Sequence, residues 1–187
     1  DVIPCLRCDK CHVAFMGGPW INVCSVNPLY GIEHRYERLI ESVSPRKIAV
    51  IGGGPIGMRA ALYAKEQGHD VTIYEKTGKL GGQLFHADYP GFKWPLKNYK
   101  DYLIRQVEKA GIPVLLNTEA TPELIGQGGY DAVFAATGAA PKLPDIPGVD
   151  GANVHTHLSV YGNEEKLGHK VVVIGGSESA VETALYL

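Results

Sequence analysis

Four cysteines lie close together at the start of the chain, and thiolates are strong ligands for soft metal centres. The spacing is Cys5-x2-Cys8-x2-Cys11-x12-Cys24, and residues 25–187 contain no further cysteine. Three cysteines at two-residue intervals can direct their thiolates around one centre, and a distant fourth can complete the set, as cubane cluster ligation requires. A proline, Pro28, follows the last cysteine, as in ferredoxin-type loops. The spacing therefore predicts a [4Fe-4S] cluster held by these four cysteines.

Other uses of the cysteines fit the pattern less well. A structural zinc site usually pairs two C-x2-C units across a longer gap, whereas three of these cysteines crowd at one end. Disulfides are typical of small secreted proteins, whereas the rest of this chain has the pattern of a cytosolic nucleotide-binding domain. His12 lies beside Cys11, but four cysteines already complete a ligand set, so we expect it to be a bystander.

A glycine-rich turn, Gly52-x-Gly54-x-x-Gly57, is the second feature that could do chemistry. In a dinucleotide-binding fingerprint the first glycine allows the tight turn, the second lets a pyrophosphate approach the backbone, and the third allows close packing of helix on strand. The N–H groups at the start of the following helix then face the phosphates. Glu75 lies 23 residues after Gly52 and can accept hydrogen bonds from ribose hydroxyls. The alternative is a glycine-rich turn with no ligand.

A strand–turn–helix–strand unit must position these residues. Lys47 to Ile51 is a short apolar run that predicts a buried parallel strand. Met58 to Gln67 is rich in helix formers and is followed by Gly68. Val71 to Tyr74 predicts the second strand. The whole unit has the size of a βαβ motif.

The same design returns near the end of the chain. Val171 to Ile174 predicts a strand, and the turn that follows has the degraded pattern Gly175-x-Ser177-x-x-Ala180. Small residues still stand where bulk would block a pyrophosphate or the packing of the helix. The turn predicts a second nucleotide site, for NAD(P)H; the alternative is a structural relic of a duplicated fold. The residue that selects NADH or NADPH would end the next strand, after Leu187.

The intervening segments predict further elements. Tyr99 to Ala110 has the apolar spacing of an amphipathic helix, Ile112 to Leu116 and Asp131 to Ala136 are expected to be strands, the latter buried, and Glu33 to Val43 a short polar helix. The run Leu80 to Gln83 is a weak signal alone, but after a dinucleotide fingerprint it suggests the loop that follows the ribose and lies near the flavin. Thr137-Gly138 is likewise weak alone, and it would bring the backbone close to the middle of a bound dinucleotide. We therefore expect an α/β fold with three parts: a cluster loop and linker at 1–44, a Rossmann-like FAD-binding domain of the glutathione-reductase type at 45–165, and the start of a second Rossmann-like, NAD(P)-binding domain at 166–187.

Composition narrows the function classes. With 45% hydrophobic and 20% charged residues, the chain is ordinary for a soluble globular protein. A net charge of −2 gives no electrostatic reason to expect nucleic acid or an anionic membrane as a partner. No apolar run is long enough to span a bilayer, and the first residues do not resemble a signal peptide. Because there is no initiator Met and the chain stops inside a predicted domain, we expect a piece of a longer polypeptide. An exposed cluster would be labile to oxygen, so we expect the protein in an anaerobic or microaerobic cytoplasm.

The combination resembles one family over essentially the whole chain. A C-x2-C-x2-C-x12-C loop directly before Ile48 to Gly57, followed by Leu80 to Gln83 and Ala136 to Gly138, is similar to the C-terminal part of the iron–sulfur branch of the old yellow enzyme family of NADH:flavin oxidoreductases. That branch includes 2,4-dienoyl-CoA reductase, 2-enoate reductase and trimethylamine dehydrogenase. The resemblance implies an FMN-binding TIM barrel upstream that carries the substrate pocket, so no catalytic residue is expected in this chain.

The resemblance also implies the roles of individual residues. Cys5, Cys8, Cys11 and Cys24 would ligate the [4Fe-4S] cluster. FAD would contact Gly52, Gly54, Pro55, Ile56, Gly57, Glu75, Lys76, Gly82, Gln83, Ala120, Thr137 and Gly138. NAD(P)H would contact Gly175, Ser177 and Ala180. Electrons would pass from NAD(P)H to FAD, to the cluster and to FMN, for reduction of an activated C=C bond in an enoate or dienoyl-CoA substrate.

Three alternatives to this function stay open. The cysteine spacing is closer to the trimethylamine dehydrogenase group, which implies an amine dehydrogenase with ADP in place of FAD; the intact second turn and Gln83 instead match FAD-binding members. A non-catalytic electron-transfer module, with the cluster joining two domains, is another possibility. The small subunit of glutamate synthase also joins clusters to an FAD domain, but it has more cysteines, in two groups. Substrate and oligomeric state are not readable from the sequence.

Overall fold

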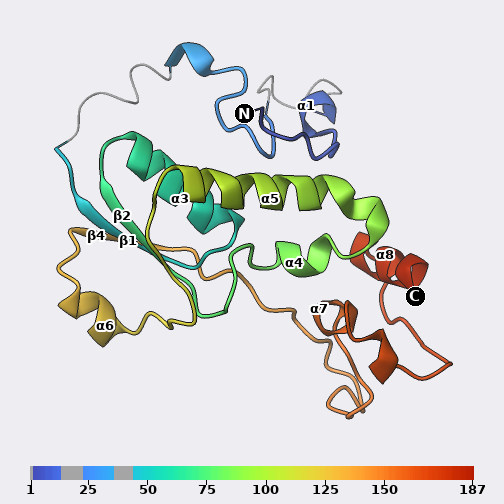
Figure 1. Ribbon diagram of the computed structural model, residues 1–187. Helices are drawn as coiled ribbons and strands as arrows, with labels where there is room; N and C mark the ends of the chain where they lie inside the picture. Colours follow the sequence, from blue (N-terminus) through green and yellow to red (C-terminus); the bar gives the residue numbers. More distant parts are fainter. Residues whose placement is uncertain (1, 14–22, 36–43) are drawn as a thin grey trace.

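The computed structural model describes residues 2–13, 23–35 and 44–187 (Figure 1). Four parallel strands form one sheet in the order β3-β2-β1-β4. The strands are β1 (Lys47–Ile51), β2 (Asp70–Tyr74), β3 (Val114–Leu115) and β4 (Ala132–Ala135). The helices are α1 (Lys10–Val13), η1 (Glu33–Arg35), α3 (Pro55–Glu66), α4 (Leu84–Ala87), η2 (Gly91–Lys93), α5 (Trp94–Lys109), α6 (Pro122–Gln127), α7 (His157–Val160), η3 (Glu164–Lys166) and α8 (Glu178–Tyr186).

The two faces of the sheet are covered by different helices, and strand periodicity decides which residues reach each face. Val50 and Ile73 lie on one face and join the main core, to which α3 contributes Met58 and α5 contributes Leu103. The alternate positions lie on the other face, where Ala49 and Tyr74 pack with Ile125 of α6. Figure 1 shows α3 and α5 together on one side of the sheet and α6 on the other. This arrangement confirms the predicted α/β, Rossmann-like class.

The two long helices begin where proline allows it. Pro55 stands in the first turn of α3, directly after Gly54, and Pro95 stands in the first turn of α5. Proline fits there because the first N–H groups of a helix have no partner within the helix. The predicted apolar face of α5 is confirmed: it buries Tyr99, Tyr102, Leu103 and Val107.

Two expectations about strands are wrong. Residues 171–174 form no strand, and Val172 is 84% exposed. A strand satisfies its backbone groups only through a neighbouring strand, and within the described parts of the chain none pairs with this segment. The run Asp131 to Ala136 does contain β4, but β4 is exposed rather than buried, because it lies at the sheet edge beside β1 alone.

Smaller differences concern length. The predicted strand Ile112 to Leu116 is reduced to the two residues of β3. Of the predicted polar helix Glu33 to Val43, the first three residues form η1, and residues 36–43 lie outside the described residues. No helix in the described ranges is both long and apolar enough to cross a membrane.

Candidate dinucleotide site and cysteine loop

The turn between β1 and α3 depends on two glycines that no other residue could replace. Gly52 has φ of +105°, and a Cβ there would lie 2.3 Å from the carbonyl oxygen of Ala136. A Cβ on Gly57 would lie 1.9 Å from the carbonyl oxygen of Gly52. The first glycine therefore brings the turn against the end of β4, and the third lets α3 pack against the turn, as the fingerprint predicts.

Gly54 has a different role, because the protein does not fill the space beside it. Its backbone is extended (φ −73°, ψ 179°), a conformation open to any residue. The nearest protein atom to an added Cβ would be the Cα of Gly82, at 3.9 Å. Gly54 is also the N-cap of α3, and no side chain caps the N–H groups of that first turn. This open backbone with free N–H groups fits an approaching pyrophosphate.

The carboxylate of Glu75 is buried beside the turn and fixes it. Glu75 follows β2 and is 6% exposed. Its Oε2 accepts a hydrogen bond from the N–H of Gly53 at 2.7 Å, and its Oε1 accepts one from the N–H of Thr77 at 2.8 Å. Each oxygen keeps a second lone pair that could accept a ribose hydroxyl. Glu75 thus both holds the glycine turn and presents acceptors at the end of β2.

The loop Leu80 to Gln83 lies against the same turn. The N–H of Gly81 donates to the carbonyl of Gly53 at 2.9 Å. Gly82 packs closely on Gly54, because a Cβ added to Gly82 would lie 2.9 Å from the Cα of Gly54. Gln83 is exposed, and its side-chain amide donates to the carbonyl of Ala139. This contact ties the loop to the segment after β4.

The segment after β4 completes the group. The N–H of Ala136 donates to the carbonyl of Ile51 at 2.8 Å, which places the segment beside the turn. Thr137 and Gly138 follow it and are exposed, and Gly138 has φ of +74°. The structure thus brings together three of the predicted segments, the turn, the loop and Thr137-Gly138, with Glu75.

The remaining residues predicted to contact FAD lie around this group. Pro55 is in the first turn of α3 beside Ile56, which is 66% exposed. Lys76 directly follows Glu75 and is exposed. Ala120 instead packs against the cluster of Ala49, Tyr74 and Ile125.

The four cysteines are all free thiols. The N–H of Arg7 donates to the sulfur of Cys5 at 3.3 Å, and the sulfur of Cys8 lies 3.2 Å from the hydroxyl oxygen of Ser25. The Ser25 hydroxyl and the backbone N–H of Lys10 lower the pKa of the Cys8 thiol, which favours the thiolate that metal ligation needs.

These thiols have the donor chemistry of an iron–sulfur cluster site, but they are not gathered around one centre. Among the described residues, no three His, Cys, Asp or Glu side chains form a group that could hold a metal ion. The loop is nevertheless fixed to the domain, since Cys24 packs against the main core and the Arg7 guanidinium lies 4.7 Å from the centre of the Trp94 ring at the start of α5. The cluster and its ligands therefore stay a prediction.

The second glycine-rich turn lies apart from the first. Gly175 has φ of +136°, Ser177 is the N-cap of α8, and Ala180 lies in its first turn. An ion pair between Lys93 and Glu182 and the ring contact of Tyr89 with Tyr186 hold α8 against the α4–α5 connection. Figure 1 shows α8 at that end of the molecule, away from the sheet. The helix predicted to follow this turn is present as α8, whereas the strand predicted to precede it at residues 171–174 is not formed.

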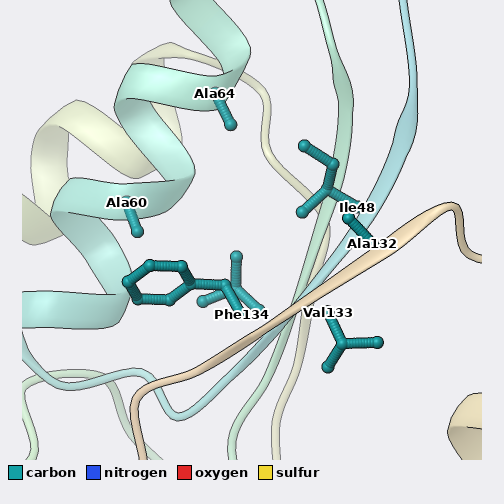
Figure 2. A pocket seen from close by; sticks show the side chains of 7 residues that line it. Ile48, Ala60, Ala64, Ala132, Val133 and Phe134 are labelled. Atoms are coloured by element: carbon teal, nitrogen blue, oxygen red, sulfur yellow. The ribbon is translucent and has the colours of Figure 1, made fainter.

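One apolar pocket lies elsewhere, beside the exposed strand β4. It is lined by Ile48, Val50, Ala60, Ala64, Ala132, Val133 and Phe134. Figure 2 shows Phe134 directed towards the two alanines of α3. The lining offers no polar or charged side chain, so the pocket has none of the groups that would orient a dinucleotide.

The comparisons agree with this geometry. The family described as pyridine nucleotide-disulphide oxidoreductase matches residues 47–187. An NADH oxidase of Thermoanaerobacter brockii is 36% identical over 97% of this chain and 29% of its own length. A cinnamate reductase of Clostridium sporogenes is 34% identical over 100% of this chain and 28% of its own length. A solved 2-naphthoyl-CoA reductase in complex with 2-naphthoyl-CoA superimposes with a TM-score of 0.87 at 34% identity, covering 97% of this chain and 28% of that one.

The chain belongs to the pyridine nucleotide-disulphide oxidoreductase family. The relatives confirm the narrower resemblance, to the FAD- and NADH-dependent oxidoreductases of the old yellow enzyme type. The family supports FAD and NAD(P)H as the two nucleotides. The chain spans less than a third of the length of the curated relatives just named.

The sequence interpretation missed two groups of residues close to these sites. Lys100 and Asp88 form a buried ion pair beneath the loop of Gly81. The signal was present, because Leu96, Lys100, Leu103 and Val107 follow helical spacing and place a lysine on an apolar face. Ser25, next to Cys24, was also missed, and no pattern in the sequence singled it out.

Proposed function

We propose that this chain is the electron-input part of an NAD(P)H-dependent flavin and iron–sulfur oxidoreductase that reduces an activated C=C bond. The observation that carries the proposal is the convergence of the glycine turn, Glu75, the loop Leu80 to Gln83 and the segment after β4 around one open stretch of backbone at Gly54. Residues 45–165 would form the FAD-binding unit, and residues 166–187 would begin the NAD(P)H-binding unit.

The residues of the first site divide the work of holding FAD. The N–H groups at the start of α3 would receive the pyrophosphate, where Gly54 leaves room for it. Glu75 would accept the ribose hydroxyls, the loop at Gly82 would lie near the flavin, and Gly138 would allow close approach of the middle of the dinucleotide. Bound there, FAD would supply the chemistry that joins a hydride donor to carriers of single electrons.

The loop that carries the four cysteines would hold an iron–sulfur cluster, which transfers single electrons. Cys5, Cys8, Cys11 and Cys24 would ligate a [4Fe-4S] cluster, and the contact of Arg7 with Trp94 would keep the loop against α5. FMN and the substrate would belong to a part of the polypeptide outside this sequence. The names of the cinnamate and 2-naphthoyl-CoA reductases support an enoate or acyl-CoA thioester as the class of substrate.

The first experiment identifies the cofactors directly. We would purify the full-length protein under anaerobic conditions, determine its iron and acid-labile sulfide, identify the nucleotide released on denaturation, and titrate the visible spectrum with NADH and then NADPH. We expect iron, sulfide and FAD, with bleaching by one of the two nucleotides. Release of ADP with no bleaching by either nucleotide would replace the proposal with an amine-dehydrogenase type of protein.

A matched pair of glycine variants tests the site itself. Gly54→Ala adds a methyl group where the protein has room, and because alanine is a poorer N-cap than glycine it should cost no more than about 1 kcal/mol of folding stability. FAD binding should weaken at least about tenfold through the clash with pyrophosphate. The control is Gly126→Ala on α6, where an added Cβ meets no atom within 4 Å. FAD content per protein and urea unfolding measure the two effects. Full FAD occupancy in Gly54→Ala would show that the pyrophosphate lies elsewhere.

A further inference from the structure

A buried ion pair lies beneath the loop that we assign to FAD. The side chain of Lys100 is 8% exposed and that of Asp88 is 6% exposed, and the ammonium nitrogen lies 2.5 Å from Oδ2 of Asp88. Asp101 is a more distant neighbour, with Oδ1 at 4.0 Å from the same nitrogen and a side chain that is 34% exposed. Replacing a buried ion pair by well-packed apolar residues is often neutral or stabilising, so stability alone does not explain why this pair is present.

The pair contacts the loop through Gly81 and Phe85. The Lys100 ammonium lies 4.0 Å from the centre of the Phe85 ring, and the Lys79 ammonium lies 3.9 Å from the same centre. A Cβ on Gly81 would lie 2.7 Å from Cε2 of Phe85 and 3.0 Å from Cδ of Lys100. The backbone of Gly81 therefore rests directly on the phenyl ring and on the aliphatic stem of the lysine.

Gly81 connects this pair to the dinucleotide site. Its N–H donates to the carbonyl of Gly53, and its neighbour Gly82 packs on Gly54. A change at Lys100 or Asp88 thus acts on a loop that touches the glycine turn on its other side. Charges inside a protein are weakly screened, so an unbalanced charge at this position would be felt by a group bound along the loop.

We propose that Lys100 and Asp88 are positioning residues for FAD, which hold the loop Leu80 to Gln83 from below and balance the local charge that sets the reduction potential of the flavin. The inference rests on the proposed function, because it assumes that FAD lies along this loop. A cation near a flavin stabilises the added electrons, and an anion disfavours them. The two residues should therefore act in opposite directions when either is neutralised alone.

The test compares neutral variants of the FAD-loaded protein. Asp88→Asn leaves the lysine charge unbalanced and should raise the FAD reduction potential, whereas Lys100→Gln leaves the aspartate charge and should lower it. The double variant Lys100→Gln with Asp88→Asn removes both charges and should return the potential towards that of the unmodified protein. Lys109→Gln is the matched control: it removes the same charge from the last turn of the same helix, where the residue is exposed, and it should leave the potential unchanged.

The outcomes separate the inference from the proposed function. Spectroelectrochemical titration gives the potential, and FAD content is measured for every variant. If Lys100→Gln does not fold, Asp88→Asn and the double variant still give the sign and its reversal. Single variants that bind FAD but leave its potential unchanged, or shift it in the same direction, would overturn the inference and leave the proposed function standing. Absence of FAD from the unmodified protein would overturn both.

Discussion

The two glycine-rich units of this chain share one sequence design and have different structures. Each has a lysine, an apolar run, a Gly-Gly pair and a helix, at 47–57 and at 170–180. The first forms β1, a tight turn and α3, and Val50 within its strand is 1% exposed. The second forms α8 but no strand, and its counterpart Val173 is 38% exposed.

The difference shows that the helix of the motif forms from its own segment, whereas the strand needs neighbouring strands. A helix satisfies its own backbone groups, and α8 needs only a suitable start at Ser177 and side-chain anchors. A parallel strand depends on neighbours, and β1 has both β2 and β4 in register beside it. The apolar run is thus a necessary condition for the strand, whereas the partners decide whether it forms.

The largest expected effect on stability comes from Gly57, the third small residue of the first turn, and it contrasts with Ala180 at the matching position of the second turn. Gly57→Ala places a Cβ 1.9 Å from the carbonyl oxygen of Gly52, so the turn must open, and we expect a loss of about 3 kcal/mol or more in the free energy of unfolding. The opposite change at the matching position of the second unit, Ala180→Gly in α8, should cost no more than about 1 kcal/mol, through the flexibility of glycine in a helix. Urea unfolding measures both. Equal losses would mean that the two turns are equally tight.

A smaller effect separates the two apolar runs. Val50→Thr buries a hydroxyl in the main core and should cost about 1 to 3 kcal/mol. Val173→Thr, at the matching position, changes a residue without strand partners and should stay within about 0.5 kcal/mol. The same unfolding measurement applies. A loss at Val173 comparable with that at Val50 would indicate that residues 171–174 form a strand in solution.

The sequence was informative where steric demands are strict. Only glycine permits the φ of Gly52 and the contact at Gly57, so the residues themselves reveal the turn, and the turn fixes β1 and α3. The apolar face of α5 follows from its periodicity in the same way. In each case the pattern and the physical requirement are local to one element.

The misjudged features depend on residues distant in sequence. The apolar run of β4 resembles a buried strand, but burial is set by its place at the sheet edge, which the run does not encode. Lys100 on an apolar face becomes intelligible only with Asp88, from the segment after α4. The cluster ligands stay a prediction: the cysteine spacing predicts the cluster, and the structure places the loop on α5 through the contact of Arg7 with Trp94.

The smallest expected effect concerns the side chains that anchor the second unit in place of a sheet. Tyr186, at the end of α8, donates a hydrogen bond to Glu164, and this bond raises the pKa of Tyr186 to about 12. Because the folded-state pKa lies above the ordinary value of about 10, the stabilisation is fully present below pH 10 and is lost as the pH rises through about 12. The anchor of α8 therefore contributes throughout the neutral range.

Glu164→Gln tests this anchor, because it removes the charge and returns one tyrosine towards its ordinary pKa. Ultraviolet absorbance of tyrosinate against pH should show that single shift. Tyr74 provides the internal control in the first unit, since its hydroxyl contact with Tyr130 raises its pKa to about 12 without any part played by Glu164. An unchanged titration curve would mean that the hydrogen bond to Glu164 does not anchor α8, which leaves the ring contacts of Tyr89 and Tyr161 with Tyr186 and the ion pair of Lys93 with Glu182.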